Sequence, residues 1–196
     1  MNKSISRRSK AKAKLRGKIM REAERIYLKE GFEAVTMRRL ADSISYTATT
    51  LYLYFQNREA IFAELAKQSF EKLDASLAAA TRKLSALEDL RLGLETTLRF
   101  GLNAPGHFFL LFPNKPSTCF SSEGTRILEW FESKLQASCL ETRAKWIAPP
   151  PETATFMLSA VYGMVTFGTR FRPDLAETFL KYRKNVTQNL VESFKA

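Results

Sequence analysis

The sequence is short of the residues that most catalytic and metal sites need. Its 196 residues include one histidine and two cysteines, Cys119 and Cys139, which lie twenty positions apart with no CxxC motif around them. This spacing argues against a zinc site or a disulfide scaffold. A Gly-rich phosphate loop and a nucleophile with a recognisable partner are also missing. We therefore expect a protein that is not an enzyme, has no metal or cofactor, and keeps its thiols reduced and largely buried.

Long apolar runs are scarce as well. The first residues carry charge instead of the roughly 7–15-residue apolar stretch of a secretory signal. Residues 153–169 are uncharged, but they contain four Thr and one Ser and are shorter than the roughly 20 apolar residues of a membrane-spanning helix. We expect a cytoplasmic protein with no membrane partner. In it, residues 153–169 form a helix buried on nearly all sides, which a dimer makes possible.

Acidic residues are absent before Glu22. Residues 1–18 hold eight of the 31 Lys and Arg residues, whereas residues 19–72 balance eight basic against eight acidic residues. The remaining 15 basic and 12 acidic residues leave only +3 of the net charge of +11 for residues 73–196. Such a run is often just a solvated terminus. We expect residues 1–18 to be a flexible basic arm that can neutralise phosphates and so adds salt-sensitive affinity for them.

Helical periodicity runs through the rest of the chain, and sustained two-residue alternation is absent, so we expect an all-α fold. Apolar residues from Ile19 to Tyr27 form a helical stripe, which Gly31 can end in a left-handed cap. A long helix is expected from Arg58 to about Leu84. Two closing helices, 152–171 and 174–194, are joined so tightly that they should lie antiparallel.

Two short helices joined by a tight turn are expected within residues 36–62. Thr36 and Thr47 are placed to cap them, because a Thr hydroxyl can accept a hydrogen bond from a free backbone N–H. Leu40 and Ala41 face inward on the first helix, and Leu51 and Phe55 on the second, while Leu53 points outward. This pattern is typical of a helix-turn-helix, which places one helix in the major groove of DNA.

The segment TMRRLADSISYTATTLYLYFQNREAIF, residues 36–62, resembles the TetR family of bacterial transcriptional regulators. The turn departs from the family pattern at Ser45, where Gly is usual, so a positive φ there would carry a side-chain cost. The resemblance implies a homodimeric helical regulator. Its helix-turn-helix domain would span residues 19–62, and a helical ligand-binding and dimerisation domain would span residues 63–196.

The resemblance also assigns DNA-contacting positions. Phosphate contacts fall on Thr36, Tyr52, Tyr54 and Arg58, and base edges are approached by Arg38, Ala48, Thr49 and Thr50, with Leu53 at the groove wall and Thr47 at the helix start. The physical division agrees, because phosphate contacts need a hydroxyl or a cation. Since residues 47–55 contain no Arg, Gln or Asn for bidentate base contacts, Arg38 is the best candidate for a guanine contact.

The second domain is rich in large apolar side chains, most of which must be ordinary core. A pocket for a small apolar ligand could lie among them, lined by His107, Phe108, Phe112, Trp130 and Phe131. A lone histidine is nonetheless more often structural. For the dimer, small residues in the uncharged helix would let a second helix approach closely, namely Ala160, Gly163 and Gly168.

Together these features predict a sequence-specific regulator of transcription that binds double-stranded operator DNA. It would be a repressor released by a small-molecule ligand, and a homodimer through its last two helices. The alternative is a basic helical protein that binds RNA or a membrane surface without reading a DNA sequence. A preference for one duplex over random duplex at physiological salt separates the two.

Overall fold

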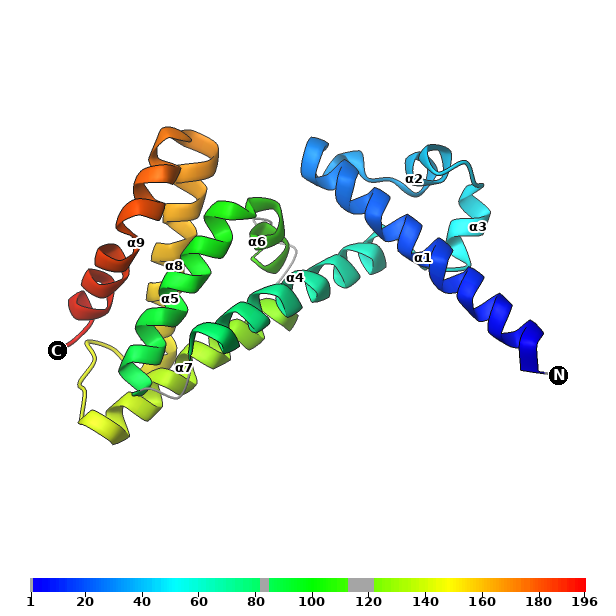
Figure 1. The fold of residues 1–196 in the computed structure, drawn as a ribbon. Helices are drawn as coiled ribbons and strands as arrows, with labels where there is room; N and C mark the ends of the chain where they lie inside the picture. The colour runs from blue at the N-terminus through cyan, green and yellow to red at the C-terminus, as the bar shows by residue number, and fades with distance from the viewer. Residues whose placement is uncertain (1, 82–84, 113–121) are drawn as a thin grey trace. The chain divides into compact units, whose positions relative to one another are not determined.

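The computed structural model describes residues 2–81, 85–112 and 122–196 (Figure 1). All its extended regular elements are helices, as the all-α prediction requires. Outside them, the described ranges contain one isolated bridge, between Trp146 and Lys195. The chain divides into two compact units, one ending at Leu65 and one beginning at Ala66. The sequence places this boundary after Phe62. Cys119 lies outside the described residues.

The first unit contains α1 (Asn2–Glu30), a 3₁₀ turn (Phe32–Ala34), α2 (Met37–Ser43), α3 (Ala48–Tyr52) and the start of α4 (Arg58–Ala80). Its core is made by the inward residues that the sequence predicts. Ile19, Ala23, Leu40 and Leu51 are fully or almost fully buried, and Ile61 closes the core from α4. The three helices of the expected domain therefore pack through one apolar centre.

The helix α1 begins much earlier than the sequence suggests. Residues 2–18, expected as a flexible arm, are helical and continuous with the predicted first helix. A physical reason is that residues 2–16 contain no Pro or Gly and many Ala, Lys and Arg, which are good helix formers. Figure 1 shows this amino-terminal half of α1 extending past α3.

The end of α1 differs in detail from the expected cap. Gly31 has φ 88° and ψ −180°, so its φ is positive, as expected, but its ψ is extended rather than left-handed helical. This region of backbone space is essentially restricted to glycine. Phe32 then folds back, with its ring centroid 4.3 Å from that of Phe62.

The second unit contains the rest of α4, then α5 (Ala86–Asn103), α6 (Pro105–Leu111), α7 (Ser122–Thr142), α8 (Pro150–Thr166), a π-helical turn (Phe167–Phe171) and α9 (Asp174–Ser193). Helix α5 is central because α6, α7, α8 and α9 all pack against it. Two of its glycines make this possible. A Cβ at Gly93 would lie 2.5 Å from the Trp130 ring, and one at Gly101 would clash with Val165.

The two predicted closing helices agree closely with the structure. Pro105 begins α6, Pro150 begins α8, and only Arg172 and Pro173 separate the π-helical turn from α9. Within one chain, helix α8 keeps one side exposed, so its predicted burial on nearly all sides would need the dimer. Phe156 and Phe167 are about half exposed, and Gly163 is exposed. Within the described ranges, every helix is too short or too polar to span a membrane.

Candidate functional site

Helices α2 and α3 are each fixed at their amino end by a capping hydrogen bond. The Thr36 hydroxyl accepts a hydrogen bond from the Arg39 backbone N–H at 3.2 Å, and the Thr47 hydroxyl accepts one from the Thr50 N–H, also at 3.2 Å. Both predicted N-caps are thus confirmed. Ser45, in the turn between the helices, has φ 61°, so the turn does require a positive φ and the side chain of Ser45 carries the cost that glycine would avoid.

The predicted DNA-contacting residues lie at the amino end of α2, along and just after α3, and at the first residue of α4. Exposure separates them from the core, since Leu53 is 74% exposed and Tyr52 is 54% exposed, while Leu51 is 0% and Phe55 4% exposed. The exposed members of the predicted set are Thr36, Arg38, Thr47, Thr49, Tyr52 and Leu53, and the half-buried members are Ala48, Thr50, Tyr54 and Arg58. Hydroxyls, a guanidinium and one leucine of the predicted set are therefore exposed on this unit.

The three arginines of this region differ in their ion-pair partners. Arg58 bonds to Glu59 at 3.1 Å and to Glu33 at 3.3 Å, and the Glu59 hydrogen bond in particular raises the pKa of this guanidinium. Arg39 binds Glu30 at 2.7 Å, and this hydrogen bond holds the pKa of the Glu30 carboxyl below its ordinary value. Arg38 is exposed and forms no ion pair within the described ranges, which suits it best for a contact with DNA.

Two cations that the sequence places in the basic arm belong to the domain instead. Arg16 donates from Nη1 to the Tyr54 carbonyl at 3.2 Å and from Nη2 to Glu64 at 3.3 Å, and its guanidinium lies 4.3 Å from the Phe55 ring centroid. Lys18 donates from Nζ to the Ile44 carbonyl at 3.0 Å. Sequence reasoning missed both, and their only signal is their position immediately before the buried Ile19.

The predicted ligand-lining residues lie in the core of the second unit. Phe108 and Phe131 are almost fully buried, Phe112 is 6% exposed, and Trp130 packs against this core. Rings meet within two pairs, Phe108 with Phe112 at 5.0 Å and Trp130 with Phe131 at 4.9 Å between centroids.

His107 is tied to α4 rather than to the aromatic rings. Its Nδ1 lies 3.0 Å from the Ser69 hydroxyl and its Nε2 lies 3.2 Å from Lys72 Nζ. Because an ammonium can only donate, Nε2 acts as the acceptor in this contact. The histidine therefore has at least two structural partners in the structure.

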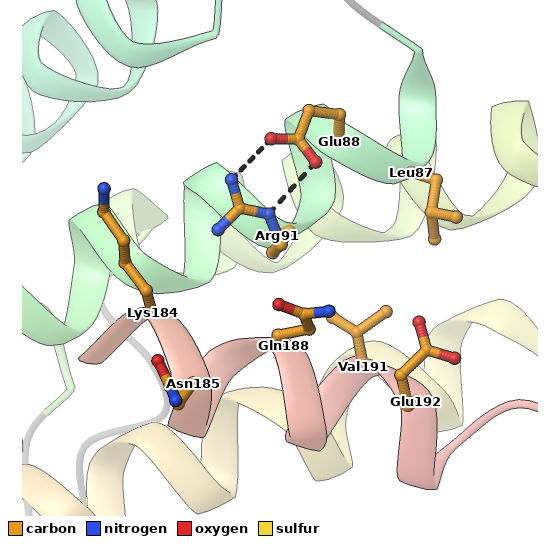
Figure 2. A pocket seen from close by; sticks show the side chains of 8 residues that line it. All are labelled: Leu87, Glu88, Arg91, Lys184, Asn185, Gln188, Val191 and Glu192. Carbon is orange, nitrogen blue, oxygen red and sulfur yellow. Dashed lines mark hydrogen bonds and ion pairs between the residues drawn. The ribbon is translucent and has the colours of Figure 1, made fainter. Parts of the chain in front are cut away.

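A groove of about 480 Å³ lies between α5 and α9 (Figure 2). Its lining is mainly charged and amide side chains, with Glu88 and Arg91 hydrogen-bonded to each other across 3.0 Å. This contact lowers the pKa of Glu88. None of the five predicted ligand residues lines this groove, which consists of Leu87, Glu88, Arg91, Lys184, Asn185, Gln188, Val191 and Glu192. Its polar lining does not suit the predicted apolar ligand.

One face of α8 and the following turn carries exposed apolar residues. Phe156, Gly163 and Phe167 recur at helical spacing, and the Phe171 ring centroid lies 5.8 Å from that of Phe167. A Cβ at Gly163 would meet no atom within 4 Å, whereas one at Gly168 would lie 3.1 Å from Phe179. Gly168 therefore serves packing inside the unit, and its expected place at a dimer contact is wrong.

Comparison with known proteins gives one family and one fold. Residues 19–65 match the family described as bacterial regulatory proteins, tetR family. A protein of unknown function from Rhodococcus sp. RHA1 has a TM-score of 0.73 at 16% identity, over 93% of this chain and 96% of that one. The TetR family transcriptional regulator PfmR from Thermus thermophilus has a TM-score of 0.65 at 20% identity, over 86% and 92%.

A TetR family transcription regulator from Marinobacter aquaeolei also has a TM-score of 0.65, at 19% identity, over 94% of this chain and 97% of that one. No curated protein matches the chain. At these identities the solved structures establish the fold, and the family match covers residues 19–65 of the unit that carries α2 and α3.

Proposed function

We propose that this chain, a member of the TetR family by its amino-terminal domain and its fold, binds one double-stranded operator sequence as a homodimer. In this proposal it is a repressor, and a small apolar ligand in the second unit releases it from the operator. Specific contacts come from α2 and α3, and the exposed lysines of α1 add affinity for phosphates.

The observation that carries the DNA-binding role is the outward face of α3. Tyr52 at the end of α3 and Leu53 just after it are exposed, as is Thr47 at its start, although the same short helix buries Leu51. A leucine that is 74% exposed is unfavourable in water and suits contact with a thymine methyl or the groove wall. Short side chains at Ala48 and Thr49 let the backbone of α3 approach the base edges.

The uncharged face of α8 supports the homodimer. Phe156 and Phe167 are eleven positions apart, which places them about 20° apart around an α-helix and about 16 Å apart along it. Between them Ala160 and Gly163 leave room for a second helix. Apolar stripes of this kind pair well with a two-fold copy of themselves, because each copy covers the other.

For the ligand, support comes from buried polar atoms beside aromatic rings. The Tyr162 hydroxyl and the Thr166 hydroxyl are buried and make no hydrogen bond within the described ranges. The Tyr162 ring lies 6.0 Å from that of Phe108. An apolar molecule carrying one polar group would satisfy these hydroxyls and contact the predicted residues Phe108 and Phe112, which is the usual composition of a small-ligand site.

The test is selection of duplexes by the purified protein from a random pool at physiological salt. We expect one motif with two-fold symmetry, because a homodimer presents two copies of α3. The selected duplex placed before a reporter gene should reduce expression, and a ligand should restore it. Equal binding to all duplexes, governed by salt alone, would instead favour the RNA- or membrane-binding alternative.

A further inference from the structure

The recognition helix α3 is too short to hold its own orientation. It contains five residues, Ala48–Tyr52, whereas isolated helices shorter than roughly 12–15 residues are marginal in water. Its direction must therefore come from contacts with the rest of the unit. The burial of Leu51 and Phe55 attaches α3 to the unit, but an apolar contact is non-directional and does not fix the direction of the helix. Hydrogen bonds to fixed backbone groups are directional.

Two cations from α1 supply such bonds, one on each side of α3. Lys18 binds the carbonyl of Ile44, the C-cap residue that follows α2. Arg16 binds the carbonyl of Tyr54, just after α3. Cations are favoured at helix carboxyl ends because the last carbonyls lack helical partners and carry partial negative charge. The segment from Ser45 to Leu53 is thus held at both ends by a single helix.

Arg16 makes the firmer of the two attachments. Its guanidinium joins the Tyr54 carbonyl to Glu64 of α4 and also lies over the Phe55 ring. Three elements, α1, the exit of α3 and α4, therefore meet at one side chain. A planar guanidinium suits this role, because it can donate in two directions and stack on an aromatic ring at once.

The lysines earlier in α1 are different. Lys10, Lys12 and Lys14 are exposed and make no ion pair within the described ranges. Such ammonium groups are available to phosphates, whereas the donors of Arg16 and Lys18 are directed to carbonyls of the domain. The eight cations of residues 1–18 therefore include exposed lysines that can bind phosphates and two residues, Arg16 and Lys18, that bind the domain itself.

From this we infer that Arg16 and Lys18 are positioning residues that orient α3 for reading a DNA sequence, and are not part of the phosphate-binding charge. The inference rests on the proposed function for its effect on DNA. Its structural part, that α1 holds residues 45–53 in place, applies to the free protein and can be measured without DNA.

The experiment compares charge-matched variants of the full chain. Arg16→Gln and Lys18→Gln each remove one positive charge, as does the control Lys14→Gln, and glutamine has a helix propensity close to those of Arg and Lys. Affinity is measured for the selected duplex and for random duplex over a range of salt. Circular dichroism and thermal unfolding establish that each variant is folded.

We expect Arg16→Gln to lower the preference for the selected duplex over random duplex about tenfold, comparable to the loss from one mismatched base pair. Lys14→Gln should lower both affinities alike and reduce the salt slope by about 0.9, as expected for one lost phosphate contact. If Arg16→Gln and Lys18→Gln behave as Lys14→Gln does, the inference is wrong.

Arg16→Lys provides a second test if Arg16→Gln does not fold. It keeps the charge but cannot reproduce the planar two-way donation, so the salt slope should remain while the preference falls.

Hydrogen exchange in the free protein provides a third test. Exchange of residues 45–54 should accelerate in Arg16→Gln and not in Lys14→Gln, and unchanged exchange would refute the structural part. A wild-type protein that prefers no duplex would refute the proposed function, and hydrogen exchange would still decide whether α1 holds α3.

Discussion

Helices α3 and α8 both expose large apolar side chains, but the chemistry around those side chains is opposite. Leu53, next to α3, is 74% exposed in a stretch of sequence that holds Thr47, Thr49, two tyrosines and, five positions on, Arg58. Phe167, at the end of α8, is 53% exposed in a stretch with no charge from residue 153 to residue 169. Exposure alone therefore does not identify a partner. A polar, cationic surround suits a polyanion, and an uncharged one suits a copy of the same face.

The largest effect should come from placing a charge on the α8 face. In Phe167→Glu, a carboxylate would have to be desolvated between two copies, which is costly without a partner. We expect a monomer at micromolar concentration by light scattering. Operator affinity should fall about 100-fold, because the two DNA-binding units of a dimer would no longer bind as one linked pair.

The matched control is Leu140→Glu, which changes an 85% exposed leucine on α7 in the same way. This variant should remain a dimer and keep its operator affinity. A dimeric Phe167→Glu protein would show that the uncharged face of α8 is not the interface and would remove the contrast with α3.

The exposed face of α8 and the core-facing side of the turn after it can be told apart by changing one glycine on each to alanine. Gly168→Ala places a Cβ 3.1 Å from Phe179 and 3.2 Å from Leu102, and because of this crowding its free energy of unfolding should be lower than that of Gly163→Ala by about 1–2 kcal/mol. Gly163→Ala has open space around it in the chain itself. It should leave the unfolding of the monomeric Phe167→Glu protein unchanged or slightly favour the folded state, as measured by urea titration. Equal losses at both positions would mean that Gly163 also faces the core.

Sequence reasoning was most successful where the determining contacts are local. Thr36 and Thr47 cap helices through a backbone N–H three residues away, and Ser45 occupies the turn position at which the family pattern has glycine and where φ is positive. A motif can specify such features because all participating atoms lie within a few residues. The inward positions of Leu40 and Leu51 follow in the same way from helical periodicity.

Contacts between distant segments were harder to predict. Arg16 and Tyr54 are 38 positions apart, and nothing in the composition of residues 1–18 distinguishes an inward cation from an outward one. Gly168 lies five positions after Gly163, about 140° around an α-helix, so it faces Phe179 instead of a second chain. The groove between α5 and α9 was also missed, because its lining comes from helices far apart in the sequence.

A smaller effect is expected on the DNA-binding side from Tyr52→Phe, which removes one exposed hydroxyl. If that hydroxyl bonds a phosphate, its loss should weaken binding to the selected duplex and to random duplex by about 1 kcal/mol each, roughly fivefold. Tyr46→Phe is the control, since Tyr46 is 43% exposed in the turn but is not a predicted contact. A loss confined to the selected duplex in gel-shift titrations would contradict the phosphate assignment and make Tyr52 a reader of bases.

The smallest expected effect concerns the acidic residues that compete with DNA for a cation. Glu33 binds Arg58 at 3.3 Å, so a phosphate at Arg58 competes with this carboxylate for the guanidinium. Exposed ion pairs are worth only about 0–1 kcal/mol, and Glu33→Gln should therefore tighten DNA binding about two- to threefold in fluorescence anisotropy titrations. Glu30→Gln makes the same change in net charge but releases Arg39, which is not a predicted contact. If both variants tighten binding equally, Arg58 has no special role and the gain reflects net charge alone. A larger gain for Glu33→Gln would place the phosphate at Arg58 and extend the polyanion-binding face from α3 to the start of α4.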